Sequence, residues 1–251
     1  MLTKELEEPK AVDVDQKRVR FSEAHWYDPE GKINVFVGGV GSIGSYLCYL
    51  LARQNINIYA YDHDLVEEQN LGGQLYSDKD FGSSKIDALA KNIESLCEDA
   101  KCYFAQLKVD LDDKELREAL YSDIQPYVFS CFDNMLARKH LFTAWVDKFK
   151  DVEDAIFIDG RMLAEQGQVF VVTKDRIGEY EKYLYSDDEV AEAPCTFKYT
   201  TFCATMISSL MISSFNNYIG NKIVPVREVP FKIEYNLQLL KFDVHEYKST
   251  T

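Results

Sequence analysis

Residues 33–64, INVFVGGVGSIGSYLCYLLARQNINIYAYDHD, contain the pattern that decides the fold. An apolar run at 33–37 leads into a glycine-rich turn and a helix-forming stretch, and a second apolar run at 56–61 ends at Asp62. The turn fits the motif G-x-G-x-x-G and stands between a predicted strand and a predicted helix, as that motif requires. The stretch therefore predicts a strand, a phosphate-binding turn, a helix and a second strand.

Three glycines and one acid give this turn its expected chemistry. Gly39 permits a tight turn, Gly41 lets a phosphate approach the backbone, and Gly44 lets the helix pack close to the strand. Free N–H groups at the start of the helix, together with the helix dipole, favour an anion there. Asp62 follows the glycines by about 20 residues, where an acid binds ribose hydroxyls. The alternative is a structural glycine turn that binds no nucleotide.

Composition and charge exclude several classes of protein. The chain has 251 residues, 46% of them apolar, and a formal charge of -14, which suits one large α/β domain. The negative charge and the lack of a basic stripe argue against nucleic acid or an anionic membrane as a partner. No apolar run reaches the roughly 20 residues that span a bilayer, and the charged N-terminus lacks a signal-peptide core. We therefore expect a cytoplasmic protein.

The cysteines do not predict a metal site. They stand at positions 48, 97, 102, 131, 195 and 203, and no two of them form a C-x-x-C pair. Structural zinc is not expected from that spacing, nor is a disulfide framework in a chain of this size and compartment. Most of them are expected to be small core residues.

Predicted strands and helices alternate as far as residue 159. Helices are expected at 85–98, 114–121 and 135–149, and strands at 103–109, 127–131, 155–159 and 168–173. This alternation predicts an α/β fold with a Rossmann-like, doubly wound and mostly parallel sheet.

The pattern changes after residue 173. A short helix is expected at 177–185, an acidic linker at 186–195, a long apolar helix at 201–218 and antiparallel strands in the tail at 222–244. The sequence leaves open whether this tail extends the sheet or forms a small flap. We predict a mobile lead-in at 1–16 and one domain at 17–251, with a Rossmann core at 17–173 and the linker, helix and strands at 174–251.

Polar residues follow the glycine turn in a distinctive order. They are Asp62-His63-Asp64, Asn70-Leu71-Gly72-Gly73-Gln74, Lys85 and Asp133-Asn134. With this order and spacing the chain resembles the ThiF/MoeB/HesA superfamily, the bacterial relatives of ubiquitin-activating enzymes, and especially its small stand-alone members in bacteria and phages. The matching blocks cover residues 33–138 and, more loosely, the chain to 215. The resemblance implies adenylation, with ATP and Mg²⁺, of the C-terminal carboxylate of a small β-grasp protein, either ubiquitin-like or a sulfur carrier.

The resemblance also implies a role for each matching position. The turn and Lys85 would hold the phosphates, Asp62 the ribose, and Asp133 the magnesium. These residue types suit the chemistry, because attack of a carboxylate on phosphorus needs positioning, a cation and a metal held by oxygen ligands. The implied nucleotide-binding residues are Gly39, Gly41, Ser42, Gly44, Asp62, Asp64, Asn70, Gln74, Lys85 and Asn134, and the implied catalytic residues are Lys85, Asp133 and Cys195.

One position departs from the family pattern. The family places an arginine before the glutamine of Asn-x-x-Arg-Gln, where it reaches the phosphates, and this chain has Gly73 there. Loss of one such donor costs several kcal/mol of transition-state stabilisation, on the order of an oxyanion-hole donor. Arg18, Arg20 and Arg138 are the candidate substitutes.

Cys195 follows the acidic linker and precedes the long helix. In relatives that pass on the activated protein, the cysteine at this place forms a thioester or persulfide, and Lys198 nearby would favour a thiolate. The alternative is a spectator cysteine. Arg161 is either a substrate-binding residue or part of a structural ion pair. The resemblance also implies a homodimer.

Three functions remain open at this level. The first is adenylation of a protein or peptide C-terminus, with transfer through Cys195 as an extension. The second is nucleotide binding without efficient catalysis, which Gly73 motivates. The third is an NAD-dependent oxidoreductase, since the glycines and Asp62 fit NAD equally well. A dehydrogenase has no reason to carry Asn70, Gln74, Lys85 and Asp133-Asn134 in that order.

Overall fold

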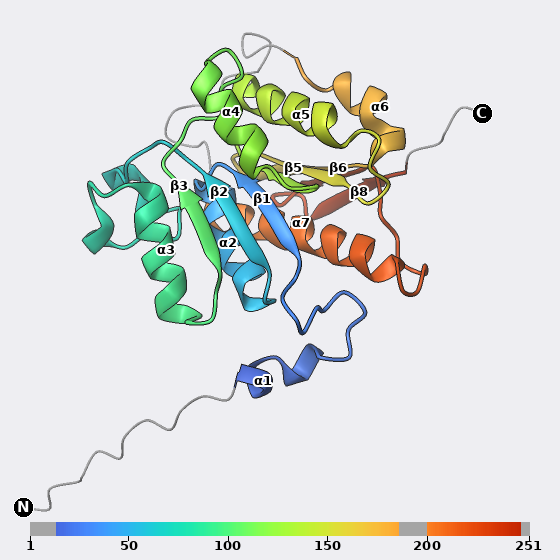
Figure 1. Ribbon diagram of the computed structural model, residues 1–251, viewed down its shortest axis with the longest axis horizontal. Coiled ribbons are helices and arrows are strands. Elements are labelled where there is room, and N and C mark those ends of the chain that lie inside the picture. Colours follow the sequence, from blue (N-terminus) through green and yellow to red (C-terminus); the bar gives the residue numbers. More distant parts are fainter. Residues whose placement is uncertain (1–13, 186–199, 247–251) are drawn as a thin grey trace, which may run out of the picture.

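The protein, described here by a computed structural model over residues 14–185 and 200–246, is built on one eight-stranded sheet (Figure 1). The strand order is β3-β2-β1-β4-β5-β6-β7-β8. The strands are β1 (Asn34–Gly38), β2 (Asn57–Tyr61), β3 (Cys102–Ala105), β4 (Tyr127–Ser130), β5 (Ile156–Leu163), β6 (Gln166–Val172), β7 (Lys232–Asn236) and β8 (Lys241–His245).

The sheet is parallel from β3 to β5 and antiparallel from β5 to β8. The predicted fold class is therefore confirmed. The tail extends the main sheet as β7 and β8, which settles the choice between an extension and a separate flap. After β1 the chain crosses to β2 on one side, and after β4 it crosses to β5 on the other side. Because these two connections leave in opposite directions, a crevice opens at the carboxyl ends of β1 and β4.

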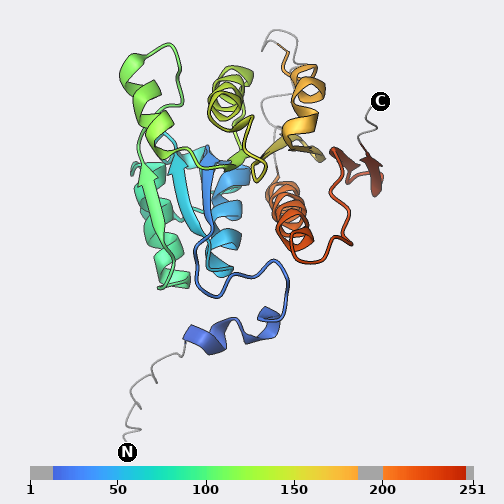
Figure 2. The ribbon, with the colours of Figure 1, turned by 45° about the vertical axis from the view of Figure 1, so that its right-hand side comes forward.

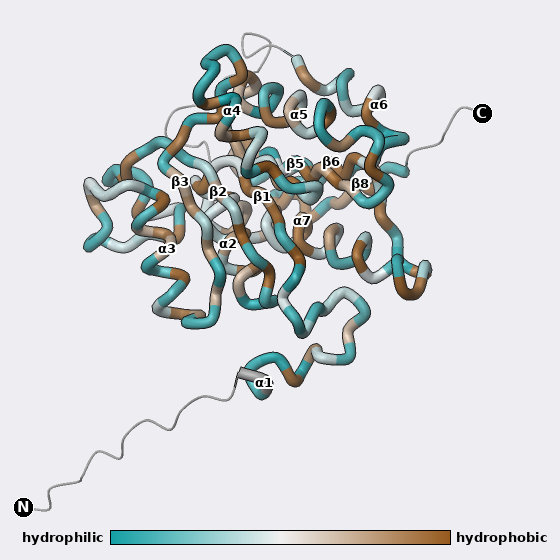
Figure 3. Tube along the Cα trace, in the orientation of Figure 1, coloured by the Kyte–Doolittle hydropathy of each residue, from teal (hydrophilic) through white to brown (hydrophobic). Residues whose placement is uncertain are grey.

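Helices cover both faces of the sheet (Figure 2). One face carries α2 (Ser42–Arg53), α3 (Lys85–Leu96) and α7 (Thr201–Asn221), and the other carries α4 (Lys114–Asp123), α5 (Met135–Phe149) and α6 (Ile177–Glu181). Each face has its own apolar core, and Figure 3 shows hydrophobic residues along the central strands. No helix in the described ranges is both long and apolar enough to cross a membrane.

Two strand predictions were wrong in length. The strand expected at 103–109 ends at Ala105, and the chain then turns so that residues 107–110 line a cavity instead of the sheet. The strand expected at 155–159 continues to Leu163, because it pairs with β6 as an antiparallel hairpin. Of the predicted lead-in at 1–16, residues 1–13 lie outside the described residues, and residues 14–16 belong to α1 (Val14–Lys17).

Candidate functional site

The glycine turn closes tightly at the end of β1. Gly39 has a φ of +84°, a backbone conformation that favours glycine, and its N–H donates to the carbonyl of Tyr61 on β2 at 2.9 Å. A Cβ on Gly44 would lie 1.9 Å from the carbonyl oxygen of Gly39, whereas a Cβ on Gly41 would meet only Gln74, at 3.9 Å. Gly44 thus permits close packing and Gly41 leaves open space, as expected.

The start of α2 is free to receive an anion. Its N-cap is Gly41, and no side chain caps the helix there. Ser42 lines the adjoining cavity, as predicted for a nucleotide-binding residue. Uncapped N–H groups and the helix dipole together favour a phosphate at this point.

Asp62 braces the turn as well as facing the cavity. One carboxylate oxygen accepts the N–H of Val40 at 2.8 Å, and the other accepts the N–H of Asp64 at 2.9 Å. Asp62 also lines the cavity beside Gly39. A carboxylate has about four acceptor sites, so these two bonds leave capacity for ribose hydroxyls.

Lys85 is a buried cation at the start of α3. Its Nζ lies 2.8 Å from a carboxylate oxygen of Asp64, and its own N–H donates to the carbonyl of Asp64 at 3.0 Å. The lysine side chain is only 9% exposed, whereas Asp64 is 50% exposed. The ammonium is therefore held at one place on the cavity wall by a partner that solvent still reaches.

Asn70 and Gln74 come from the loop between β2 and α3. Asn70 accepts the N–H of Glu67 at 2.8 Å in a capping box, so its side chain shapes the loop. Gln74 is buried, and its Oε1 has no hydrogen-bond partner within the described parts of the chain. A buried amide oxygen without a partner is costly unless a ligand or water satisfies it. Both residues line the large cavity.

Asp133 and Asn134 follow the end of β4. The N–H of Cys131 donates to the carbonyl of Gly38 at 2.8 Å, and Asn134 caps α5 by accepting the N–H of Ala137 at 2.8 Å. Asp133 lies between these two hydrogen-bonded residues, and its side chain is exposed. Across 14–185 and 200–246, no ion pair joins it to a lysine, arginine or histidine. An exposed carboxylate of this kind suits an Mg²⁺ ligand.

These side chains share two adjoining cavities. One lies over Gly39, Gly41 and Asp62, and the other, of about 1600 Å³, extends from Ser42 across the strands β5 to β8. Lys85, Asp133 and Asn134 line both of them. The structure therefore brings together every predicted nucleotide-binding residue except Gly44, whose role is to pack the turn.

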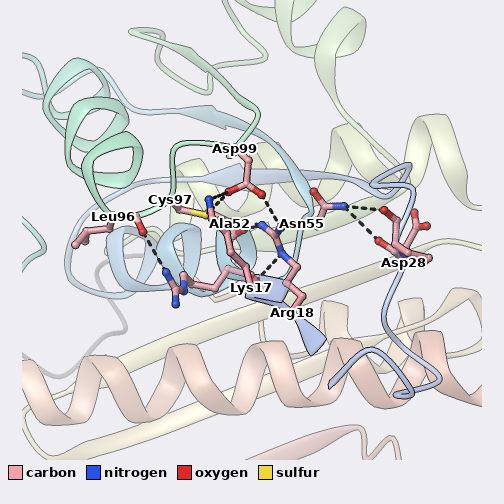
Figure 4. A network of polar contacts seen from close by, with 10 residues as sticks. Lys17, Arg18, Asp28, Ala52, Asn55, Leu96, Cys97 and Asp99 are labelled. Atoms are coloured by element: carbon pink, nitrogen blue, oxygen red, sulfur yellow. Dashed lines mark hydrogen bonds and ion pairs between the residues drawn. The ribbon is translucent and has the colours of Figure 1, made fainter. Parts of the chain in front are cut away.

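The two predicted substitutes near the N-terminus are in the wrong place. Arg18 donates to the carbonyls of Arg53 at 3.1 Å and Ala52 at 3.4 Å and pairs with Asp99 (Figure 4). Ala52 and Arg53 lie at the C-terminal end of α2, one helix length of about 18 Å from the glycine turn. Arg18 therefore cannot reach phosphates in its own subunit, and Arg20 lies at the same end, exposed.

Arg138 and Arg161 are committed to a buried ion cluster. Arg138 pairs with Asp159, and Arg161 donates to the same carboxylate through Nε at 2.7 Å. Arg161 also donates to the carbonyl of Tyr183 at 3.0 Å. Of the two predicted roles for Arg161, this geometry supports the structural ion pair, and it argues against Arg138 as a free phosphate ligand.

Burial argues against Cys131 and Cys203 as nucleophiles. Burial raises the pKa of the Cys131 thiol to about 12, although this residue borders the cavity. Cys203 is fully buried, and its sulfur lies 3.2 Å from the hydroxyl of Tyr235. Cys195 and Lys198 lie outside the described residues.

Several cavity residues were not predicted from the sequence. The register places Gln168, Glu234 and Asp243 in one row with Arg161, which the sequence had singled out, and this row across β5 to β8 forms part of the floor of the large cavity. Lys108, Asp110 and His140 border the cavity over the turn. Asp110, Asp112 and His140 could hold a cation, but the Nδ1 of His140 already accepts the N–H of Leu111 at 3.2 Å. No motif marks these positions, because they meet only in the folded sheet.

A glycine turn, an acid at the end of β2 and a crevice at the carboxyl ends of β1 and β4 define a Rossmann-like protein with the geometry of a nucleotide site. The family model described as the ThiF family matches residues 29–249, and the chain belongs to that family. The ubiquitin-like modifier-activating enzyme 5 of Aedes aegypti is 31% identical over 120 residues. That match covers 44% of this chain but only 30% of the relative.

Solved structures show the same fold. PaaA is similar with a TM-score of 0.67 and 17% identity, over 98% of this chain and 77% of that one. Escherichia coli MccB with ATP has a TM-score of 0.66 and 14% identity, over 95% and 73%. The microcin C7 biosynthetic enzyme MccB in complex with N-formylated MccA has a TM-score of 0.62 and 15% identity, over 86% and 65%. At these identities the likeness is one of fold.

Proposed function

We propose that the chain binds ATP with Mg²⁺ at the carboxyl ends of β1 and β4 and adenylates a carboxylate. The observation that carries this proposal is that the glycine turn, Lys85 and Asp133, from three separate elements, line adjoining cavities. Membership of the ThiF family and the solution of MccB with ATP support it.

The residues fit both groups. The uncapped start of α2 suits a polyphosphate chain, and the unpartnered Oε1 of Gln74, which is an acceptor, suits a donor group of the ligand such as a hydroxyl. The exposed, unpaired carboxylate of Asp133 offers the oxygen ligand that Mg²⁺ prefers. When bound, Mg²⁺ would neutralise charge that develops on the phosphates.

The chemical step needs little covalent help from the protein. An oxygen of the acceptor carboxylate forms a bond to the α-phosphorus, the bond from that phosphorus to the bridging oxygen breaks, and pyrophosphate leaves. Lys85 supplies a fixed positive charge, and the turn orients the phosphates. Lys85 and the turn would promote the reaction through their positions alone, because the step requires no proton transfer.

The acceptor we propose is the C-terminal tail of a small ubiquitin-like or sulfur-carrier protein, or a peptide. The cavity of about 1600 Å³ exceeds the range of roughly 300–1,000 Å³ that small ligands occupy, so it has room for more than a nucleotide. Its far part crosses β5 to β8, where an extended chain could lie. Transfer to Cys195 and a homodimer are further parts of this proposal.

A second candidate is nucleotide binding with slow or absent adenylation. It is favoured by the positions of Arg18 and Arg20 at the far end of α2 and by the burial of Arg138 in an ion cluster, because none of them is placed to supply, within its own subunit, the guanidinium missing at Gly73. Gly73 is buried but is not among the glycines with positive φ, so its φ does not by itself require glycine. In this case Gly73→Arg is expected to raise ATP–pyrophosphate exchange at least tenfold, whereas an active wild type would gain little.

The first experiment is calorimetric titration of the wild type with ATP and Mg²⁺, and separately with NAD. Lys85→Ala is expected to weaken ATP binding 10- to 100-fold, since a hydrogen bond to a charged group contributes about 1.5–3 kcal/mol. Lys91→Ala is the matched control, because Lys91 is exposed on the same helix and borders neither cavity. Binding of NAD in place of ATP, or equal effects of the two variants, would refute the proposed site.

A further inference from the structure

Four side chains, of which Arg138 and Arg161 border the large cavity, form a buried cluster with one acid at its centre. Asp159, Arg138, Arg161 and Tyr180 are 0%, 4%, 8% and 0% exposed. Asp159 pairs with Arg138 through one carboxylate oxygen, and the other oxygen accepts from Arg161 at 2.7 Å and from the hydroxyl of Tyr180 at 2.8 Å. A buried charge is tolerated only with such partners, so the geometry of the cluster is strongly constrained.

The cluster holds two cations for one acid. Burial and the neighbouring Arg161 lower the pKa of Arg138 to about 10, so the guanidinium still carries its charge at neutral pH. Two backbone carbonyls also bind this guanidinium: Arg138 donates to the carbonyl of Phe132 and, at 3.4 Å, to that of Gly160, while its buried Nε has no partner in the described part of the chain. Because Asp159 has two cationic partners, loss of either one still leaves a neutral pair.

The bond from Arg138 to Phe132 reaches the loop that carries Asp133. Phe132 directly precedes Asp133, and Arg138 lies in the first turn of α5, so the side chain folds back onto its own leading loop. Asn134 fixes the other side of Asp133 by capping α5. The backbone of Asp133 is thus held on both sides, while its exposed carboxylate accepts a bond of 3.4 Å from the side-chain amide of Asn134.

We propose that Arg138 is a positioning residue, which holds the Phe132 carbonyl so that the Asp133 carboxylate is set for the metal of a bound metal–nucleotide complex. This inference rests on the proposed function, and it gives Arg138 a task other than phosphate contact. Asp159 anchors the guanidinium on its far side. Groups that orient a metal ligand in this way typically contribute 10- to 100-fold in metal affinity.

The test compares Arg138→Met with Arg161→Met. Each variant removes one guanidinium and leaves Asp159 with the other, but only Arg138→Met removes the bond to Phe132. ATP affinity is measured by calorimetry in EDTA and at increasing Mg²⁺, and binding of Mn²⁺ in the presence of ATP is followed by water-proton relaxation. Circular dichroism confirms that each variant is folded.

In EDTA, we expect the ATP affinity of Arg138→Met to be within twofold of that of the wild type. The factor by which Mg²⁺ raises the ATP affinity should be at least tenfold smaller in this variant. Asp133→Asn should do the same, and Arg161→Met should keep the enhancement. Arg138→Lys, which retains a donor for the carbonyl, should recover part of it, and this variant carries the test if Arg138→Met does not fold. Equal losses in the two methionine variants, or a full enhancement in Arg138→Met, would overturn the inference.

The outcome for the wild type separates this inference from the proposed function. Wild type that binds no ATP at all refutes both proposals. If the wild type binds ATP with an Mg²⁺ enhancement and Arg138→Met keeps that enhancement, the proposed function stands. In that case only the role of Arg138 is refuted.

Discussion

Single residues at the end of β1 serve structure and chemistry together. Asp62 accepts the N–H of Val40 in the turn and that of Asp64 just beyond β2 while lining the cavity, and Gly44 allows the backbone of α2 to touch that of Gly39. A buried N–H without a partner would cost about 1–3 kcal/mol, so the acid that is the proposed ribose ligand also stabilises the turn.

The three glycines of the turn should therefore differ in their tolerance of a methyl group. Gly44→Ala is expected to destabilise the fold by about 1–3 kcal/mol, because its Cβ would overlap the backbone carbonyl of Gly39, and to weaken ATP binding through displacement of α2. Urea unfolding measures the first effect and calorimetry the second.

Gly41→Ala is the matched control, since open space surrounds its Cβ. It should leave the free energy of unfolding within about 0.5 kcal/mol of wild type. A Gly44→Ala variant as stable as Gly41→Ala would contradict the assigned packing role.

At the scale of elements, the N-terminal segment is attached at the end of α2 opposite the cavity. Lys17 and Arg18 both pair with Asp99 (Figure 4). Burial alone would raise the pKa of Asp99, but the hydrogen bonds from Arg18 and Lys17 outweigh it and hold that pKa well below its usual range. This ion pair is the charged part of the anchor.

The pKa of Asp99 is lowered in the folded state. Its contribution to the free energy that holds the N-terminal segment in place is therefore complete above the unfolded pKa of about 4, and it is lost as the pH falls through the folded pKa. Hydrogen exchange of residues 14–21 should therefore stay constant from pH 7 to about pH 4, after correction for the intrinsic rate, and accelerate below it. Protection that disappears between pH 7 and pH 5 would be inconsistent with this anchor.

Asp99→Asn should release the same segment at neutral pH. We expect trypsin to cleave after Lys17, Arg18 or Arg20 about tenfold faster, since bonds to a charged group contribute about 1.5–3 kcal/mol. Glu98→Gln, a neighbouring exposed acid, is the control. ATP affinity should not change in either variant, because the segment lies at the far end of α2.

For the molecule as a whole, α7 joins the two halves of the sheet into one unit. It packs on α2 and on the strands β5 and β6. The ring of its Phe215 meets the rings of Tyr127 and Phe129 of β4 edge to face, with 5.4 Å between the ring centroids in each pair. The parallel and antiparallel parts therefore share one core, which argues for a single cooperative domain.

Phe215→Ala should lower the thermal midpoint of the whole chain. Removing a fully buried phenylalanine costs about 3–5 kcal/mol, which in a chain of this size corresponds to roughly 10 °C. Circular dichroism and tryptophan fluorescence, which includes Trp145 on the opposite face, should report the same transition. Phe202→Ala, at an exposed position of α7, should change the midpoint by less than about 2 °C. Two separate transitions would show that the halves unfold independently.

The doubly wound sheet, the glycine turn and the residues around it could be predicted from the amino-acid sequence. These features are local: a glycine at positive φ, an acid at a strand end and an N-terminal lysine of a helix are all legible over a few residues, as at Gly39, Asp62 and Lys85. Family membership could be inferred for the same reason, because the motif order follows the chain.

The roles of residues that are far apart in the sequence could be assigned only from the folded structure. Arg18 and Arg138 looked alike as free cations in the sequence, yet one anchors the N-terminal segment and the other lies buried against Asp159. The row from Arg161 to Asp243 became a cavity floor through strand pairing between segments far apart in the chain. Such partners are set by sheet order and burial, which depend on contacts between distant residues and have no local sequence pattern.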